Sequence, residues 1–395
     1  MPLRLGVIGY GNRIHGVVNK HLRTLCPDAR VVAVVDPDEA GARARLAECD
    51  RADVTFYPSL GALVRRARVD GLLIGTRCNL HTPYAIQAAK HDLPLYLEKP
   101  VAIDMPQATA LERAFRKSRC RVVVSFPLRL SPLAVLTRRR IEEGAIGTPE
   151  HILGVNFVSY GINYYYAHAG YRNFAITRGL FLQKATHDLD YMSMLMGSNV
   201  IRVAAMHTRG RVFGGRKSAT LRCSRCGQYH TCPESPEARR NYDPVWAVDH
   251  LCPFSRACGT PATGMNEDSS SALLEFASGV HGVYTQVFFA RRDAGSRGAT
   301  VTGYKGTLRF DWQTNELRYV RHHAPFSDTT RGDTVDGHGG GDAELVRDFR
   351  DLMEGRKRES RSTIRHGLQS VYACLAAQAS AEKGRFVDVR QAQAG

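Results

Sequence analysis

The N-terminal part of the chain alternates short apolar segments with helical segments, and this alternation restricts the fold more than any other feature. The apolar segments are residues 3–8, 30–35, 71–74, 93–97 and 121–125. Stretches with helical character, such as 83–90 and 106–117, lie between them. Strands that alternate with helices join into a parallel sheet, so the sequence predicts an α/β fold with a doubly wound parallel sheet.

A glycine-containing turn follows the first apolar segment. Its sequence is Gly9-Tyr10-Gly11-Asn12-Arg13-Ile14, and a helical stretch then runs to Leu25. In a dinucleotide-binding loop the first glycine permits the tight turn, and the second lets the backbone approach a pyrophosphate at the helix N-terminus. Ile14 takes a place where Gly or Ala is usual, which predicts looser packing of the helix on the strand. A lone GxG is a weak signal, but its position between a strand and a helix strengthens it.

Asp36 stands at the end of the second apolar segment, 25 residues after Gly11. An acid in this region hydrogen-bonds the ribose 2′-hydroxyl of NAD and repels the 2′-phosphate of NADP. The alternative is an aspartate that only begins a turn before Pro37. Because Arg43 and Arg45 fit one face of the next helix, the sequence favours NAD over NADP.

The tripeptide Glu98-Lys99-Pro100 ends the fourth apolar segment. Ligands of open α/β sheets bind beyond the carboxyl ends of the strands, and proline stiffens the turn there. Lys99 is therefore placed to act on a bound molecule. In isolation this tripeptide is more often a solvated Glu–Lys pair, but the dinucleotide loop earlier in the chain favours the functional interpretation.

Two further motifs follow in order, Thr76-x-x-Asn79-x-His81 and His187-x-x-Asp190. The ordered set resembles the glucose–fructose oxidoreductase, inositol dehydrogenase and rhizopine-catabolism family, the Gfo/Idh/MocA oxidoreductases. The resemblance continues through a GTxG-type turn at residues 303–308 and a closing strand at 385–389. Residues 209–268 fall outside it.

The resemblance implies a Rossmann domain over residues 1–127 and an α+β domain with a large open antiparallel sheet over 128–395, the latter with an insert at 209–268. It implies NAD or NADP as hydride carrier and a hydroxyl carbon of a sugar, cyclitol or related polyol as the reacting centre. The residues expected to bind the cofactor are Gly9, Gly11, Asn12, Arg13, Ile14, Asp36, Thr76, Asn79, His81, Glu98 and Lys99.

The segment 178–196 has apolar spacing that suits a helix. Residues three and four apart share a helix face, so Gln183 and Lys184 project with His187, and Asp190 lies one turn beyond. Removal of a hydride from a carbinol leaves a proton for a base, and histidine, with an ordinary pKa of about 6.5, suits that role near neutral pH. Lys99 can polarise the same hydroxyl, and Asp190 can orient the imidazole or bind a substrate hydroxyl. The alternative is that these are ordinary helix residues near a domain seam or on the surface.

Many members of the resembled family place an acid four residues before this histidine, where this chain has Gln183. Glutamine cannot take a proton at neutral pH. Lys184, one of only nine lysines, is therefore expected to contact an anionic or polyhydroxylated substrate, or to share proton transfer with His187. A surface lysine is the alternative.

Arginines and aromatic residues near this helix are further candidates for contact with the substrate. The resemblance implies that their region reaches over the nicotinamide, and arginine forks bind carboxylates. The candidates are Arg129, Tyr166, His168 and Arg172, together with Gln183. Core packing is the alternative. Residues 338–342 either belong to the site or lead flexibly into the helix predicted over 343–353.

The insert 209–268 holds half of the ten cysteines. Cys223 and Cys226 have the C-x2-C spacing of thiolate ligands for Zn²⁺ or an iron–sulfur centre. A second C-x2-C pair is missing, so Cys232, Cys252, His230 or His250 would have to complete the shell. A structural zinc, an iron–sulfur centre and free or disulfide-bonded thiols all remain open.

Composition limits the other possibilities. A length of 395 residues predicts two domains, and the net charge of +16 admits nucleic acid as a partner. The excess arginine is spread from Arg4 to Arg390 without a basic tail, so we expect no nucleic-acid partner. We also expect no membrane span, no room for a signal peptide, and a cytoplasmic location with reduced thiols.

Alternating segments between residues 267 and 321 predict successive strands of the antiparallel sheet. The apolar face of such a sheet needs a partner, which predicts a homodimer or homotetramer. The sequence as a whole predicts an NAD-dependent oxidoreductase that acts on a hydroxyl of a small polyhydroxylated substrate. Two alternatives are redox-assisted glycoside cleavage with the cofactor regenerated, and a non-catalytic NAD-binding protein.

Overall fold

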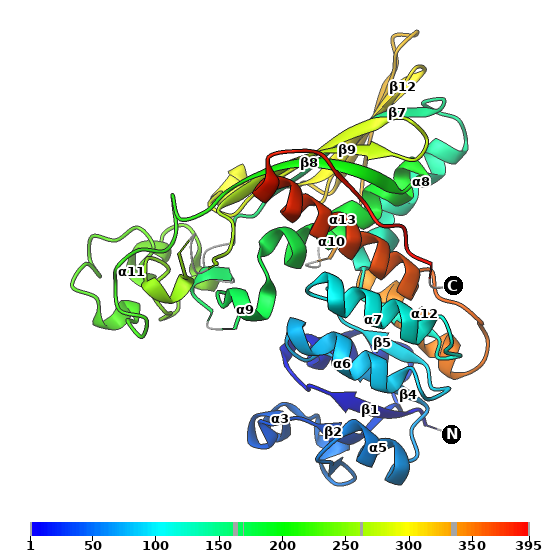
Figure 1. Cartoon of the computed structure of the whole chain (residues 1–395), viewed down its shortest axis with the longest axis vertical. Helices are drawn as coiled ribbons and strands as arrows, with labels where there is room; N and C mark the ends of the chain where they lie inside the picture. The colour runs from blue at the N-terminus through cyan, green and yellow to red at the C-terminus, as the bar shows by residue number, and fades with distance from the viewer. Residues whose placement is uncertain (1, 161–164, 169, 261–263, 333–337, 394–395) are drawn as a thin grey trace. The chain divides into compact units, whose positions relative to one another are not determined.

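The computed structural model describes residues 2–160, 165–168, 170–260, 264–332 and 338–393, and the chain divides into two compact units (Figure 1). The first unit comprises Met1–Val135, Thr334–Tyr372 and Arg390–Gly395. The second comprises Leu136–Asp333 and Ala373–Val389. None of the helices among the described residues is both long and apolar enough to cross a membrane.

The first unit contains a six-stranded sheet in the order β3-β2-β1-β4-β5-β6, and every strand pair in it is parallel. This confirms the predicted α/β class. The strands are β1 (Arg4–Ile8), β2 (Arg30–Val35), β3 (Thr55–Phe56), β4 (Gly71–Ile74), β5 (Leu95–Leu97) and β6 (Val122–Val124). The sequence did not indicate the two-residue strand β3. The central strands are almost entirely buried, as a sheet covered on both faces requires.

Helices connect these strands in the expected alternation. They are α1 (Asn12–Gly16), η1 (Val17–Leu22), α2 (Arg23–Leu25), α3 (Glu39–Arg45), α4 (Glu48–Arg51), α5 (Leu60–Arg66), α6 (Cys78–Ala88), α7 (Met105–Phe115) and η2 (Pro127–Leu130), with α8 (Pro132–Glu142) at the unit boundary. The predicted helix to Leu25 is confirmed, although its middle part η1 is a π-helix.

Helix α12 (Gly341–Met353) belongs to the first unit although it lies far along the chain from the rest of it. Its residues Leu345, Val346 and Phe349 are fully buried in the same hydrophobic core as β1 and β2. The ring of Phe349 meets that of Tyr96 edge-on, with centroids 5.8 Å apart. The first compact unit therefore includes an amphipathic helix from the C-terminal part of the chain, which completes the N-terminal core, and the domain boundary at residue 127 stays a prediction.

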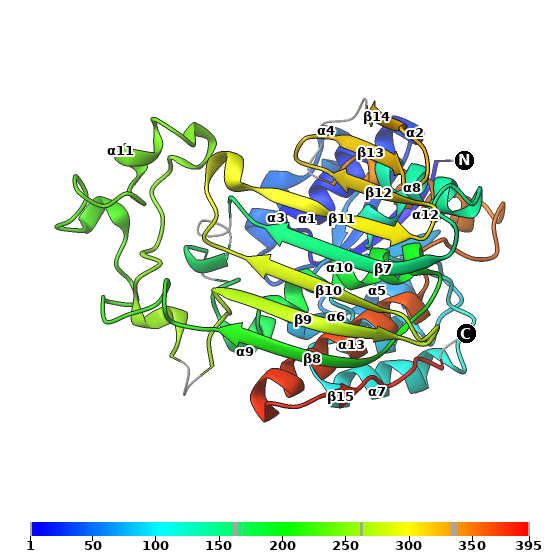
Figure 2. The same cartoon turned by 90° about the horizontal axis from the view of Figure 1, so that it is seen from above.

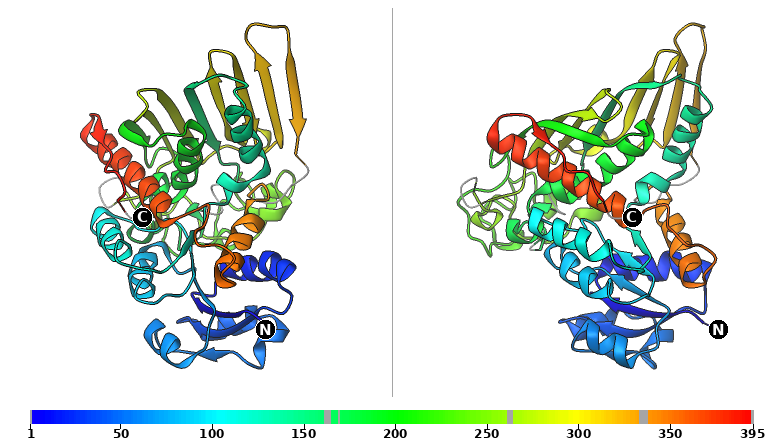
Figure 3. Two further views of the ribbon diagram at one scale, coloured as in Figure 1. Left: turned by 90° about the vertical axis from the view of Figure 1, so that its right-hand side faces the viewer. Right: turned by 45° about the vertical axis from the view of Figure 1, so that its right-hand side comes forward.

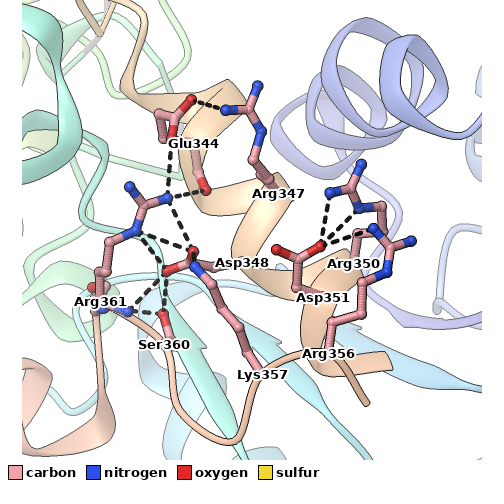
Figure 4. A network of polar contacts seen from close by, with 10 residues as sticks. Glu344, Arg347, Asp348, Arg350, Asp351, Arg356, Lys357, Ser360 and Arg361 are labelled. Carbon is pink, nitrogen blue, oxygen red and sulfur yellow. Dashed lines mark hydrogen bonds and ion pairs between the residues drawn. The ribbon is translucent and has the colours of Figure 1, made fainter. Parts of the chain in front are cut away.

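Asp348 of α12 is the centre of a polar network that fixes the loop between α12 and α13 (Ile364–Lys383) (Figure 4). Its buried carboxylate accepts hydrogen bonds from Nζ of Lys357 at 2.6 Å, from the backbone N–H of Arg361 at 2.8 Å and from Ser360 Oγ at 3.2 Å. Burial alone raises the pKa of Asp348, but the hydrogen bonds from Arg361 and Lys357 outweigh it and hold the pKa below the usual value.

Asp348→Asn is expected to lower the free energy of unfolding by about 1–3 kcal/mol at neutral pH, because hydrogen bonds to a charged group are lost. A depressed folded-state pKa stabilises the fold above the unfolded-state pKa of about 3.9, and that stabilisation is lost as the pH falls through the folded value. Denaturant titrations between neutral and acid pH should therefore show the two proteins converging in acid. Glu344→Gln, which removes a more exposed partner of Arg361, is the control and should change stability less.

The second unit contains a nine-stranded sheet in the order β14-β13-β12-β11-β7-β10-β9-β8-β15 (Figures 2 and 3). Its pairs are antiparallel except for β7 with β10, so the sheet is mixed rather than wholly antiparallel. The strands are β7 (Pro149–Phe157), β8 (Val200–Thr208), β9 (Ser269–Phe276), β10 (His281–Val287), β11 (Ser296–Gly303), β12 (Gly306–Asp311), β13 (Glu316–Arg321), β14 (Ser327–Arg331) and β15 (Val387–Asp388). The predicted closing strand at 385–389 corresponds to β15.

Helix α10 (Leu180–Met196) and the C-terminal part of α13 cover one face of this sheet (Figure 2). The packing is close, since a Cβ at Gly154 of β7 would lie 2.5 Å from Sδ of Met192. On the other face Leu153, Val283 and Leu273 stand side by side on β7, β10 and β9. Leu153 and Leu273 are 38% and 51% exposed. The predicted self-association through this sheet stays a prediction.

Candidate functional site

The glycine turn after β1 has the local geometry that a dinucleotide loop needs. Gly9 has a φ of +81°, and a Cβ there would lie 2.8 Å from the backbone nitrogen of Thr76. Gly11 is the N-cap of α1 with φ −78° and ψ 178°, no side chain caps the helix there, and a Cβ on Gly11 would meet nothing within 4 Å. The first glycine is thus required by the fold, whereas the second leaves open space beside the N–H groups that begin the helix.

Gly9→Ala and Gly11→Ala are expected to have different effects. Gly9→Ala places a Cβ against backbone at positive φ, which costs about 1–2 kcal/mol from the conformation alone and lowers the urea midpoint. Gly11→Ala should leave that midpoint unchanged and weaken NAD binding, because the methyl group takes space that a phosphate needs. Chemical denaturation and NAD titration of both variants measure the contrast. Equal loss of stability in the two variants would contradict it.

Ile14, the third position of the motif, is fully buried. The glycine that accommodates it is Gly75, directly after β4, where a Cβ would lie 2.1 Å from Cγ1 of Ile14. The bulk at one position is therefore matched by the absence of a side chain at the other.

Asp36 follows β2, and both of its carboxylate oxygens accept backbone hydrogen bonds. The donors are the N–H of Tyr10 in the glycine turn at 2.8 Å and the N–H of Asp38 at 2.9 Å. These contacts hold the carboxylate beside the turn. Arg45, nearby in sequence, donates to the carbonyl of Tyr10 at 2.9 Å.

Thr76, Asn79 and His81 follow β4 and lie in or before α6. The Oδ1 atom of Asn79 is buried and has no hydrogen-bond partner among the described residues. Both ring nitrogens of His81 lie near carbonyl oxygens, Nδ1 at 2.9 Å from Pro100 and Nε2 at 3.1 Å from Thr76. Burial lowers the pKa of His81. The imidazole thus links the loops after β4 and β5.

Glu98 and Lys99 follow β5, and the Lys99–Pro100 peptide is cis. Glu98 is buried and accepts a hydrogen bond from Nε of Arg13 at 2.8 Å. Arg13 also donates to Ser125 Oγ at 2.9 Å. Arg13, two residues after Gly11, therefore connects the glycine turn to the Glu98-Lys99-Pro100 motif through its hydrogen bond to Glu98.

Asp342, in the first turn of α12, is the last residue of the segment 338–342 that the sequence offered as a possible part of the site, and it contacts Arg13 of this cluster. Its carboxylate accepts two hydrogen bonds from Arg13, at 2.6 and 3.0 Å, and lies 2.8 Å from Nδ1 of His338. Burial alone raises the pKa of Asp342, but the charge of Arg13 outweighs it and the pKa lies well below its usual range. An acid in the first turn of a helix was visible in the sequence, but nothing in it indicated Arg13 as the partner.

These residues fit a dinucleotide cofactor. They follow the carboxyl ends of β1, β2, β4 and β5, which lie at one edge of a parallel sheet. The open space at Gly11 and the buried Oδ1 of Asn79 are features that a bound group would use. The first unit therefore carries a site suited to NAD.

In the second unit, α10 carries the remaining candidates. Gly179, with a φ of +97°, is its N-cap, and the buried carboxylate of Glu267 accepts hydrogen bonds from the N–H groups of Leu180 and Phe181. Glu267 also pairs with Arg209 at 2.8 Å, so the two ends of the insert are fixed to the start of α10. Gln183, Lys184, His187 and Asp190 are all buried, between 3% and 5% exposed. The surface alternatives for Lys184 and Asp190 are therefore wrong, whereas the roles of all four residues stay predictions.

Asp188, also on α10, is fully buried in a network that the sequence did not predict. Its carboxylate accepts hydrogen bonds from Arg297 at 2.8 and 2.9 Å, from Asn156 at 2.9 Å and from Tyr284 Oη at 2.8 Å. These partners come from β11, β7 and β10. The network fixes α10 against the sheet and thereby sets the position of the neighbouring His187.

The predicted substrate contacts have different surroundings. Arg129 is buried, with Nη2 3.3 Å from Nε2 of His366. Tyr166 is fully buried and donates to the carbonyl of Glu267, so it packs in a core rather than at an open surface. Arg172 donates to the carbonyl of Ala219 at 2.8 Å in the insert. His168 is exposed.

The cysteines of the insert are not placed as ligands of a metal ion. No group of three or more His, Cys, Asp or Glu side chains among the residues that the structure describes is placed to hold a metal ion, so the expectation of a zinc at Cys223, Cys226, Cys232 and Cys252 is not supported. The side chains have other contacts: Cys226 lies 3.6 Å from Nζ of Lys217, and His250 Nε2 lies 3.0 Å from the carbonyl of Glu234. The expected His230 is exposed and pairs with Glu237. All ten cysteines are free thiols.

A parallel nucleotide-binding sheet whose cofactor motifs meet at one edge, followed by a mixed sheet with a buried histidine-bearing helix, is the architecture of a two-domain oxidoreductase. The chain belongs to the GFO_IDH_MocA oxidoreductase family with an NAD-binding Rossmann fold. The N-terminal domain of that family matches residues 3–126, and its C-terminal alpha/beta domain matches residues 138–389.

Two curated relatives are cyclitol dehydrogenases by name. Inositol 2-dehydrogenase 1 of Saccharopolyspora erythraea is 30% identical over 215 residues, which cover 53% of this chain and 59% of that protein. The scyllo-inositol 2-dehydrogenase (NAD(+)) of Bacillus subtilis is 25% identical over 211 residues, which cover 51% and 56%. The match thus spans less than two thirds of either relative.

Solved structures share the fold over nearly the whole chain. A levoglucosan dehydrogenase in complex with NADH has a TM-score of 0.75 at 18% identity and covers 99% of this chain and 100% of its own. An NAD-binding oxidoreductase from Klebsiella pneumoniae has a TM-score of 0.72 at 21% identity, with 99% coverage of both chains.

Proposed function

We propose that this protein is an NAD-dependent dehydrogenase that oxidises a hydroxyl carbon of a sugar, a cyclitol or a related small polyol. The observation that carries the proposal is the gathering of the family's cofactor motifs at the carboxyl edge of the first unit's sheet. The relatives named as inositol dehydrogenases and the NADH-bound levoglucosan dehydrogenase support this substrate class.

The cofactor would be held by the residues already described. The glycine turn with Asn12, Arg13 and Ile14 would bind the pyrophosphate, Asp36 the adenosine ribose, and Glu98 and Lys99 the nicotinamide ribose. Thr76, Asn79 and His81 would flank it. NAD is favoured over NADP because Asp36 repels a 2′-phosphate, while Arg43 pairs with Glu39 and Arg45 with the Tyr10 carbonyl.

The bound NAD supplies the hydride acceptor, and the residues of this chain handle the proton. Lys99 polarises the substrate hydroxyl, and His187 accepts the proton that leaves as the carbonyl forms. Asp190, one turn further along α10, orients the imidazole or binds a second hydroxyl. Gln183, Arg129 and His168 are the remaining candidates for substrate contact.

The test is NADH formation by the purified chain with NAD and a panel of cyclitols and sugars, measured by absorbance. Accumulation of NADH with one member of the panel, abolished by both Lys99→Ala and His187→Ala, is the expected result. Cleavage of a glycoside without NADH accumulation would show redox-assisted cleavage instead. Tight NAD binding without turnover on any substrate would show a non-catalytic protein.

We further propose that the protein acts in the cytoplasm as a homodimer or homotetramer. The ten free thiols suit a reducing compartment. The exposed leucines on β7 and β9 suit contact with a second copy.

A further inference from the structure

Lys184 occupies an unusual place for a charged side chain. It lies against a small hydrophobic cluster of the second unit that is rich in aromatic rings. The buried members of the cluster are Val158, Tyr165, Tyr166, Leu180, Phe213, Cys258 and Phe288, and Tyr160, Tyr171 and Phe254 pack at its border. Its Nζ donates to Oη of Tyr160 at 2.6 Å. Nζ also lies 5.2 Å from the ring centre of Tyr160 and 5.8 Å from that of Tyr165. One hydroxyl and two tyrosine rings thus lie next to the amine.

No carboxylate among the described residues lies within ion-pair distance of this amine. The charged groups that influence it are Arg297 on β11 and Asp188 one turn along α10. Asp188 is already occupied by the hydrogen bonds of Arg297, Asn156 and Tyr284. Among the residues that the structure describes, none therefore offers this buried amine an available counter-ion.

Such an amine is costly to keep charged in the free protein. Burial and the charge of Arg297 lower the pKa of Lys184 well below its usual value, and Asp188 opposes this only in part. Asp188, four residues further along α10, is the carboxylate that acts on Lys184, and its charge is already paired with Arg297. An anion brought to Nζ would supply a counter-ion.

We infer that Lys184 and Tyr160 form a subsite for an anionic group, a carboxylate or a phosphate, on the polyol substrate. The inference rests on the proposed dehydrogenase function and specifies its substrate class as an acidic sugar or cyclitol derivative. The ammonium and the phenol donate to the anion, and the half-buried ring of Tyr160 packs on ring carbons. The net charge of +16 favours the approach of an anion.

Proton uptake should accompany binding of the anion. The anion stabilises the ammonium form, so the pKa of Lys184 is higher in the complex than in the free protein. Between the two pKa values, binding transfers one proton from the solvent to Nζ, and no other bond changes. This uptake is a signature that a purely structural lysine would not give.

The test compares a neutral sugar with its charged counterparts. The full-length chain, saturated with NADH so that no oxidation takes place, is titrated calorimetrically with D-glucose, D-glucuronate and D-glucose 6-phosphate in two buffers of different ionisation enthalpy. We expect one of the anions to bind about tenfold or more tightly than glucose, as a charge-assisted contact allows. Binding of that anion should be accompanied by uptake of as much as one proton by the protein. Which of the two anions binds more tightly shows whether the subsite takes a carboxylate or a phosphate.

Three variants complete the test. Lys184→Met should reduce affinity for the preferred anion to that for glucose and abolish proton uptake. Lys184→Arg should keep the preference without uptake, because a guanidinium is always charged. Lys383→Met removes an exposed lysine of the same unit and should behave like the unmodified protein.

Equal affinity of the unmodified protein for glucose and both anions would overturn the inference, whatever the variants do. So would a Lys184→Met protein that keeps both the preference and the uptake. Because binding is measured without turnover, the inference stands or falls apart from the dehydrogenase activity. A chain that binds the anion with proton uptake but never reduces NAD would refute the proposed function alone.

Discussion

Replacing His187 with glutamine is expected to lower kcat by about 10²–10⁴-fold, the usual contribution of a general base. Glutamine has nearly the shape of histidine and keeps hydrogen-bonding atoms at the same place, but it cannot accept a proton. His187 is 3% exposed on a helix that is fixed at its start by Glu267 and along its length by Asp188. The substitution should therefore change chemistry more than structure. Steady-state kinetics on the best polyol of the panel measure the effect.

The matched control for His187→Gln is cofactor binding. The residues proposed to bind NAD belong to the first unit, whereas His187 lies in the second, so NAD affinity and melting temperature should stay within experimental error of the unmodified protein. A His187→Gln enzyme that keeps more than a tenth of kcat would contradict the assignment of His187 as the base. Loss of NAD affinity to the same degree as kcat would instead point to a disturbed fold.

The parallel sheet was predictable because five of its six strands, all but β3, are short apolar runs followed by a helix. The same regularity located Gly9, Asp36 and Glu98 at strand ends, and strand ends meet at one edge whatever the details of the loops. The sequence was less informative where long-range packing decides. The spacing of Leu345 and Phe349 indicates only that they share one apolar helix face. No local feature of the sequence indicates that this face packs in the core of β1 and β2.

The second unit shows why several side-chain roles could not be predicted. Helical spacing placed Lys184 and His187 on one face, but α10 is buried nearly all round, so spacing alone did not determine their partners. Tyr166 and Arg172 are typical substrate-binding residue types, yet their partners are Glu267 and the insert. Cysteine spacing suggested zinc, but no group of side chains among the described residues is placed to hold a metal ion. Residue type and spacing indicate chemistry, but the partner that satisfies each polar group depends on tertiary contacts.

Asp188→Ala is expected to give the largest loss of stability in the second unit. The substitution leaves the Arg297 guanidinium buried without its partner, and breaking a buried ion pair from one side costs about 3–5 kcal/mol. Asn156 and the Tyr284 hydroxyl lose an acceptor as well. A loss of this size should lower the melting temperature by roughly 10 °C in a domain of about 200 residues. Differential scanning calorimetry measures the shift.

Removal of both charges should be milder than removal of either one. In Asp188→Ala combined with Arg297→Met no unpaired charge remains buried, so the double variant should recover part of the stability that each single variant loses. Arg138→Ala, which breaks the exposed pair with Glu142 in the same unit, should change stability by less than about 0.5 kcal/mol. Additive losses in the double variant would show that the two side chains act independently. The double variant is also informative about function, because the Asp188–Arg297 pair fixes the helix that carries His187 and Lys184. If the double variant recovers stability but not kcat, Asp188 and Arg297 also position the catalytic residues.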